Sequence, residues 1–174
     1  MQLTITVLGY TQSNFIGHLL SAVDDCDCSV LELRVNRLMA CTAAYLLVNG
    51  EWNQIAKLET LLESLEKKLE IKTHRLRPGK YTSKNEFTPY SLEIISLERQ
   101  EALLSMTTFI IGHNITIEEI SSSHYQAPYS QSELVTSRFI LLIPPEIRIF
   151  NLREDFLEFC DHINVDVILE PIKR

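Results

Sequence analysis

The first twenty-five residues change from one apolar period to another. Residues 3–9 alternate apolar and polar side chains, which is the period of a strand with one buried face. Ile16, Leu19 and Val23 then follow at spacings of three and four, which is the period of a helix with one apolar face. This part of the chain is therefore predicted to form a strand followed directly by a helix.

The same order of patterns occurs twice along the chain. A shift of 87 residues superimposes 5–33 on 92–120, with matching residue types. Beyond them the best shift becomes 94, which superimposes Tyr45 on Phe139. The second copy therefore has seven extra residues, and we place them at 126–132, "QAPYSQS", whose composition is typical of a loop.

Each copy is predicted to run strand, helix, strand, strand, helix, strand. In the first copy we expect strands at 3–9, 28–36, 40–49 and 69–76, with helices at 14–25 and 51–67. In the second we expect strands at 91–97, 115–124, 133–143 and 165–170, with helices at 98–112 and 146–162. In such units both helices cover one face of a four-stranded antiparallel sheet. The predicted fold is α+β, with two tandem ferredoxin-like (βαββαβ) domains.

The domain boundaries follow from the repeat. Residues 1–76 form the first predicted domain and 91–174 the second. Residues 77–90, "RPGKYTSKNEFTPY", contain two prolines and no sustained apolar period, so we interpret them as the linker.

Composition narrows the classes of function. The chain has 174 residues, 45% of them hydrophobic, and no apolar run approaches the roughly 20 residues that span a bilayer. It does not begin with a secretory leader pattern, so the expected location is the cytoplasm. The formal charge of −7 repels a phosphate backbone, and the basic side chains cluster only at 72–84, around the predicted linker. We expect no membrane and no direct nucleic-acid partner.

No residue pattern predicts catalysis or metal binding. Cys26 and Cys28 have no second pair at metal-ligand spacing, and with Cys41 and Cys160 they are expected to be reduced and mostly buried. The five histidines have no nucleophile arranged beside them. We therefore expect no catalytic residue, metal or cofactor, and an enzyme is the disfavoured hypothesis. Trp52 is expected to be half buried where the second helix starts, with a role as an exposed interface anchor as the less favoured alternative.

The two copies, together with "VLGYTQSNFIGHLLSAVDDCDCSVLEL" and "LLVNGEWNQIAKLETLLESL", resemble the ACT-domain family of small-molecule regulatory modules. In that family the turn after the first strand usually reads Asp-x-x-Gly, and its backbone amides meet an amino-acid ligand. The resemblance implies ligand-binding roles for Thr11, Gln12, Ser13, Asn14 and Phe15 in the first copy, and for Glu98, Arg99, Gln100 and Glu101 in the second.

Both turns lack the glycine of the family. Asn14 stands in its place in the first copy, and asparagine tolerates the left-handed backbone conformation. The hydroxyl of Thr11 or Ser13 is expected to cap the following helix. A side chain now fills space that a ligand would occupy, so loss of binding in at least one copy is an open alternative.

The resemblance implies a non-enzymatic regulator that responds to glycine or a related amino acid. Its implied protein partner is a transcriptional activator. The alternative is an oligomeric scaffold that has lost the ligand. Open sheet edges predict a homo-oligomer in either case. The partner is expected to contact the inserted hairpin, at Tyr125, Pro128 and Tyr129, because an addition to one copy is not required by the shared core.

Overall fold

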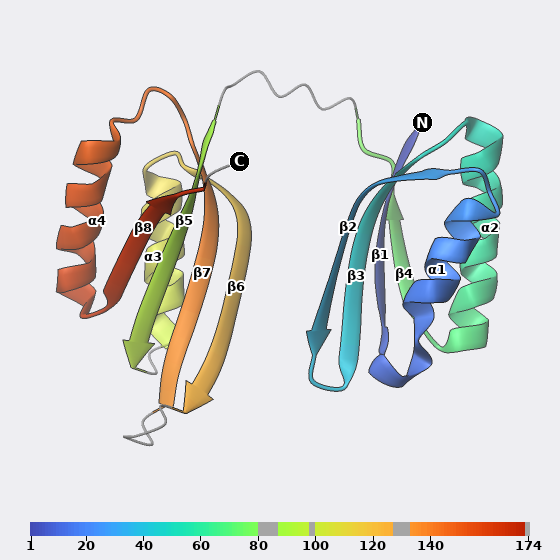
Figure 1. Cartoon of the computed structure of the whole chain (residues 1–174), viewed down its shortest axis with the longest axis horizontal. Coiled ribbons are helices and arrows are strands. Elements are labelled where there is room, and N and C mark those ends of the chain that lie inside the picture. The colour runs from blue at the N-terminus through green and yellow to red at the C-terminus, as the bar shows by residue number, and fades with distance from the viewer. Residues whose placement is uncertain (80–86, 98–99, 127–132, 173–174) are drawn as a thin grey trace. The chain divides into compact units, whose positions relative to one another are not determined.

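The computed structural model describes residues 1–79, 87–97, 100–126 and 133–172, and the chain divides into two units, Met1–Thr82 and Ser83–Arg174 (Figure 1). The first unit contains β1 (Gln2–Tyr10), the 3-10 turn η1 (Thr11–Ser13), α1 (Phe15–Asp24), β2 (Ser29–Leu38), β3 (Cys41–Asn49), α2 (Trp52–Leu69) and β4 (Lys72–Leu76). The second contains β5 (Thr88–Leu97), α3 (Gln100–Gly112), β6 (Thr116–Gln126), β7 (Glu133–Ile143), α4 (Ile149–Ile163) and β8 (Asp166–Pro171).

Each unit is a four-stranded antiparallel sheet covered on one face by two helices (Figure 1). The strand orders are β2-β3-β1-β4 and β6-β7-β5-β8, so corresponding strands take corresponding places. The predicted α+β fold with two βαββαβ units is confirmed. The opposite face of each sheet is not covered by a helix of its own unit.

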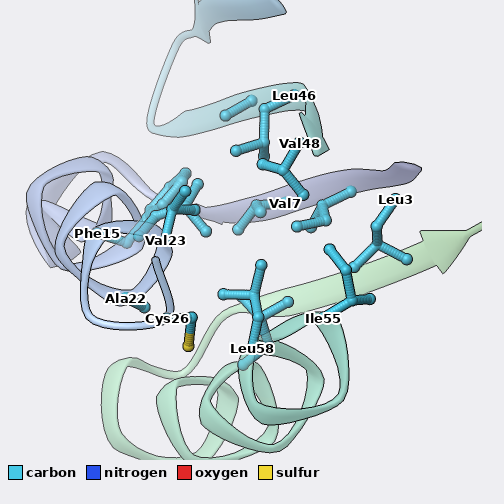
Figure 2. Close-up of a cluster of buried hydrophobic side chains, with 14 of the residues drawn as sticks. Leu3, Val7, Phe15, Ala22, Val23, Cys26, Leu46, Val48, Ile55 and Leu58 are labelled. Atoms are coloured by element: carbon cyan, nitrogen blue, oxygen red, sulfur yellow. The ribbon is translucent and has the colours of Figure 1, made fainter. Parts of the chain in front are cut away.

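The core of the first unit lies between its sheet and its helices (Figure 2). Leu3, Ile5 and Val7 of β1 are fully buried, as their alternation predicts. Helices α1 and α2 contribute apolar side chains at spacings of three and four, among them Leu19 and Leu58. Burying one such side chain stabilises the fold by about 1.5–3 kcal/mol, so this layer holds helices and sheet together.

Residues in the left-handed conformation mark the helix ends in both units. Asp27 (φ 52°) follows α1 and Asn114 (φ 57°) follows α3. Glu70 (φ 53°) follows α2 and Asn164 (φ 52°) follows α4. The left-handed residue reverses the chain after the last helical turn, which is a common way for helices to end.

Strand pairing corrects one part of the predicted repeat. Val7 pairs with Ala44, and its counterpart Ile94 pairs with Ser137, so the shift between β3 and β7 is 93 residues. Tyr45 is 40% exposed whereas Phe139 is fully buried, so the predicted superposition of these two residues was wrong. A slip of one residue moves a strand side chain to the other face. The shift of 94 holds for the second helix of each unit, because Leu58 of α2 and Leu152 of α4 are both buried.

Two predicted boundaries also change. β5 begins at Thr88, inside the predicted linker 77–90, and Tyr90 is buried in line with Leu92. Pro89 hid this strand start, since proline lacks the N–H of a paired residue, although proline is tolerated at the beginning of a strand. Helix α2 continues to Leu69, so β4 starts later than predicted.

Candidate functional site

The turn between β1 and α1 is tied to the neighbouring hairpin. The backbone N–H of Thr11 donates to the carbonyl of Ala40 at 2.8 Å, and its Oγ1 lies 3.1 Å from Oγ1 of Thr42. Asn14 has φ 46° and ψ 34°, so the predicted left-handed conformation is confirmed. Asparagine therefore performs the backbone role that glycine has in the family turn.

The predicted hydroxyl cap of α1 is wrong. Oγ of Ser13 donates to the carbonyl of Tyr10 at 2.7 Å, while the hydroxyl of Thr11 is engaged with Thr42. Asn14 is the N-cap residue and makes no side-chain cap hydrogen bond in the described structure. The turn is thus closed by the carbonyl of Tyr10 and by the hydroxyl of Thr42 in the hairpin, and neither hydroxyl of the turn caps the helix.

Phe15 supports the turn from the core of the first unit. Its side chain is 1% exposed and packs in the core of the first unit. A Cβ added to Gly9 would lie 2.6 Å from Cγ2 of Ile71 and 3.0 Å from Cδ1 of Phe15, so only glycine fits between them. Phe15 therefore holds the turn in position through its packing, and its implied contact with a ligand stays a prediction.

A hollow of about 410 Å³ lies where the turn meets the end of α2. Amines of lysine bind carboxylates, and the last carbonyls of a helix carry partial negative charge. Both features occur here, so the hollow offers contacts to each end of an amino-acid zwitterion. Its lining residues are Tyr10, Gln12, Ser13, Lys67, Lys68, Leu69 and Glu70.

The sequence predicted only the lining residues that belong to the β1–α1 turn. Gln12 and Ser13 were predicted from the family turn, whereas Lys67 and Lys68 were missed. The available signal was the pair of basic residues in the last turn of α2, a position normally explained by the helix dipole alone. Only the packing of α2 beside the sheet shows that these amines border the turn.

The corresponding turn of the second unit is described in part. Glu98 and Arg99 lie outside the described residues, and α3 begins at Gln100. Glu101 is exposed in the first turn of α3, where a carboxylate stabilises a helix through its dipole.

Of the predicted partner-binding residues, the structure describes Tyr125. It lies in β6, is 42% exposed and pairs with Leu134 of β7. Pro128 and Tyr129 lie outside the described residues.

Trp52 departs from its prediction. Its side chain is 69% exposed at the start of α2, and not half buried. The capping box of α2, made by Glu51 and Gln54, sets the first helical turn without burying the indole.

A second hollow, of about 720 Å³, lies on the helix layer of the second unit. At its edge Nδ1 of His113 is 2.9 Å from the carbonyl of Phe109, and Nε2 is 3.8 Å from Oδ2 of Asp155. Phe109 and Phe159 stack with ring centroids 4.4 Å apart. No serine, threonine or cysteine is among the described lining residues, so the hollow has no nucleophile beside its histidine.

Three of the thiols, those of Cys26, Cys28 and Cys160, are not activated. Burial raises the pKa of Cys26 and of Cys28, and it raises the pKa of Cys160 to about 11. All four cysteines are free, as predicted. A thiol that stays protonated at neutral pH is a poor nucleophile and a poor metal ligand. Within the described ranges, no three His, Cys, Asp or Glu side chains are grouped to hold a metal ion.

None of the helices in the described part of the chain is long and apolar enough to cross a membrane.

Comparison with known proteins agrees with this architecture. Residues 1–75 match the family model of the ACT domain. A candidate glycine cleavage system transcriptional repressor has a similar crystal structure, with TM-score 0.78 and 17% identity, covering 99% of this chain and 98% of that one. A protein of unknown function from Galdieria sulphuraria is similar with TM-score 0.75 and 16% identity, covering 99% and 98%. Curated protein sequences gave no match. At these identities the two structures show a shared tandem fold.

Proposed function

We propose that this chain, which carries an ACT-domain match in its first unit and the tandem ACT fold throughout, is a non-enzymatic regulatory protein that responds to a small amino acid. The observation that carries the proposal is the hollow between the β1–α1 turn and the end of α2. The turn that meets ligands in the family borders this hollow, and Lys67 and Lys68 are among the residues that line it on the side of α2. Glycine or a related small amino acid is the proposed effector.

The proposed output is binding of a transcriptional activator protein. This step is supported by the similarity of this chain's fold to the crystal structure of a candidate glycine cleavage system transcriptional repressor. The contacts of the basic segment also favour protein contact over DNA contact. Arg77 Nη2 lies 2.7 Å from Oε2 of Glu59, and Arg75 Nη1 lies 3.3 Å from Oε1 of Glu63, so carboxylates of α2 neutralise both guanidinium groups. The proposed site of action is the cytoplasm.

Oligomerisation is part of the proposal. β2 and β4 are the edges of the first sheet, and β6 and β8 are the edges of the second. Edge strands carry unpaired backbone groups that pairing with another chain satisfies. We therefore expect a homo-oligomer formed by edge pairing.

The alternative function is a scaffold that has lost ligand binding. The side chains of the β1–α1 turn favour this alternative, because Asn14 replaces glycine and the hydroxyl of Thr11 is hydrogen-bonded to that of Thr42. A scaffold of this kind would bind only other copies of this chain, through its sheet edges, and a protein partner.

Isothermal titration of the full chain separates the two functions. Glycine, L-alanine and L-serine are titrated into the wild type, into Ser13→Trp and into the control Ser21→Trp, an exposed change on α1. Sensing predicts saturable heat that Ser13→Trp abolishes and Ser21→Trp retains. Absence of heat across the three amino acids supports the scaffold.

The partner step is tested with the purified activator of the glycine cleavage genes from the same organism. Sensing predicts a complex in size-exclusion chromatography whose dissociation constant changes at least about fivefold when glycine is present. A complex that is indifferent to amino acids again supports the scaffold, and no complex removes this partner.

A further inference from the structure

The open face of the second sheet carries a set of charged side chains. Leu92 and Phe139 point into the core, so their neighbours Ser91, Glu93 and Arg138 point to the opposite face. Arg138 stands directly across from Glu93 in the pairing of β7 with β5. Two opposite charges therefore face each other on the side of this sheet away from α3 and α4.

Arg138 is held in a defined orientation. Its Nε donates to Oγ of Ser91 at 3.1 Å and lies 3.6 Å from Oε1 of Glu93. Both contacts use Nε, and among the described residues this guanidinium makes no other hydrogen bond or ion pair. Its two Nη groups keep donors in the planar fork that matches a carboxylate.

Glu170 reaches the same place from the other side. It pairs with Ser91 across β8 and β5, and it forms no ion pair with a described residue. β7 and β8 flank β5 at about two strand spacings, roughly 10 Å, and Glu170 lies two residues along the strands from the row of Arg138, which adds about 7 Å in that direction. Long side chains from both strands can therefore approach one small molecule above β5.

A hollow of about 300 Å³ lies between these groups. This volume is at the lower end of the range of small-molecule sites. Ile168, Pro171 and Ile172 add an apolar wall beside the charges. The hollow thus combines a cation, carboxylates and an apolar surface.

The first unit has the same backbone without this chemistry. Register places Thr6, Tyr45 and Leu76 at the positions of Glu93, Arg138 and Glu170. None of the three is charged, and the first sheet folds with them. The charged set of the second unit is therefore not a requirement of the fold.

We propose that this hollow binds the zwitterion of a free amino acid, with the carboxylate on Arg138, the ammonium group on Glu170 and Glu93, and the side chain against Ile168 and Ile172. The site is separate from the turn hollow of the first unit, so the inference adds a second amino-acid site to the proposed function. Its apolar wall makes L-leucine a tighter ligand than glycine.

Isothermal titration of the full chain with L-leucine tests the site. We expect Arg138→Gln and Glu170→Gln each to weaken binding at least about tenfold, since each removes one charge-assisted contact. Arg148→Gln, an exposed arginine in the same unit, is the control and should bind as the wild type does. Isovalerate and isopentylamine, which each lack one of the two charges, should give no saturable heat at the same concentrations.

The outcomes separate this inference from the proposed function. L-leucine binding that survives both Arg138→Gln and Glu170→Gln, or no L-leucine binding at all, overturns the inference. If Ser13→Trp abolishes glycine binding in that case, amino-acid sensing at the turn stands. Binding that requires Arg138 and Glu170 and survives Ser13→Trp supports the new site whatever the turn does. Glu170→Gln keeps the test valid if Arg138→Gln unfolds the sheet, because Glu170 makes no ion pair with the described residues.

Discussion

At the scale of single residues, the two copies fill the same space under the turn with different side chains. Gly9 leaves room for Phe15 and Ile71 in the first unit. In the second unit the position of Gly9 is Ser96, which is 7% exposed, and the position of Phe15 is Ala102. A larger residue on the strand therefore accompanies a much smaller one on the helix, so the side chains on the two elements compete for the same space.

We predict that Gly9→Ser lowers the free energy of unfolding by about 1–3 kcal/mol, because it overpacks the space beside Phe15. Phe15→Ala alone should cost about 3–5 kcal/mol through the cavity it leaves. The double variant should cost less than the two single changes together, since each relieves the other. Urea unfolding of the four proteins measures this coupling, and strict additivity would contradict the shared-space explanation.

Glu66 is a residue whose charge stabilises the fold. Its Oε1 accepts hydrogen bonds from the backbone N–H and from Oγ1 of Thr73, each at 2.7 Å. These bonds, with a smaller contribution from the charges of Arg75 and Lys72, lower the pKa of Glu66. The ionised carboxylate therefore joins α2 to β4 more strongly than the protonated form does.

We predict that Glu66→Gln lowers stability by about 1 kcal/mol at pH 7. Because the folded pKa lies below the unfolded value of about 4.3, the contribution is full above pH 5 and is lost as the pH falls through the folded pKa. The difference between wild type and variant should therefore shrink below about pH 4. Urea unfolding from pH 7 to pH 3 measures it, with Glu154→Gln, a change at an exposed position of α4, as the control. A difference independent of pH would sink the charge explanation.

At the scale of elements, the two hairpins share an irregularity and differ in length. The pairing of β2 with β3 shifts between Val30 and Glu32, and that of β6 with β7 shifts between Ile117 and Glu119. These positions correspond in the repeat, so the bulge belongs to the shared fold. The second hairpin is longer, and its pairing continues to Gln126 and Glu133.

Replacing residues 127–132 by Asn-Gly tests the function of that longer hairpin. A two-residue turn suits paired strands, so stability should change by less than about 1 kcal/mol. Affinity for the activator should fall at least about tenfold if the hairpin contacts the partner. Calorimetry gives both values, and unchanged affinity would exclude Pro128 and Tyr129 from the partner surface.

At the scale of the whole molecule, each unit encloses its own core. The buried cluster of the first unit draws only on residues 3–71 and that of the second only on residues 90–165. We predict that residues 1–82, produced alone, unfold cooperatively in urea with native circular dichroism. Gradual loss of signal without a transition would show that the first unit depends on the second.

Charge is divided unequally between the units. Acidic and basic residues are equal in number in 1–82, so the formal charge of −7 belongs wholly to 83–174. Like charges oppose a compact state, and salt screens them. Raising NaCl from 20 to 500 mM should therefore stabilise an isolated 83–174 segment more than 1–82. Equal shifts of the two urea midpoints would contradict this prediction.

The order of elements could be predicted because burial leaves a local record in the sequence. The period of two in β1 and the spacing of three and four in α2 each arise from one buried face. The wrong superposition of Tyr45 on Phe139 could not be avoided on that basis. Both residues are aromatic, and the neighbouring residues of the two copies match almost as well when the shift is changed by one. Only hydrogen-bonded pairing distinguishes the two registers.

The candidate sites were predictable only in part, because hydrogen bonds and hollows join residues that are distant in sequence. Ser13 or Thr11 was predicted to cap the helix, yet the hydroxyl of Ser13 donates to Tyr10 and the hydroxyl of Thr11 is hydrogen-bonded to that of Thr42. Lys67 and Lys68 were not connected with that turn until α2 was seen to end beside it.

The sequence by itself determined the twofold repeat, the strands and helices of each unit and the left-handed turn at Asn14, since each depends on neighbours within a few residues. Tertiary structure alone decided the strand register, the borders of the turn hollow and the meeting of Arg138, Glu93 and Glu170. Those features depend on three strands or on a strand and a helix coming together, and the spacing of residues along one chain does not record which side chains then face each other.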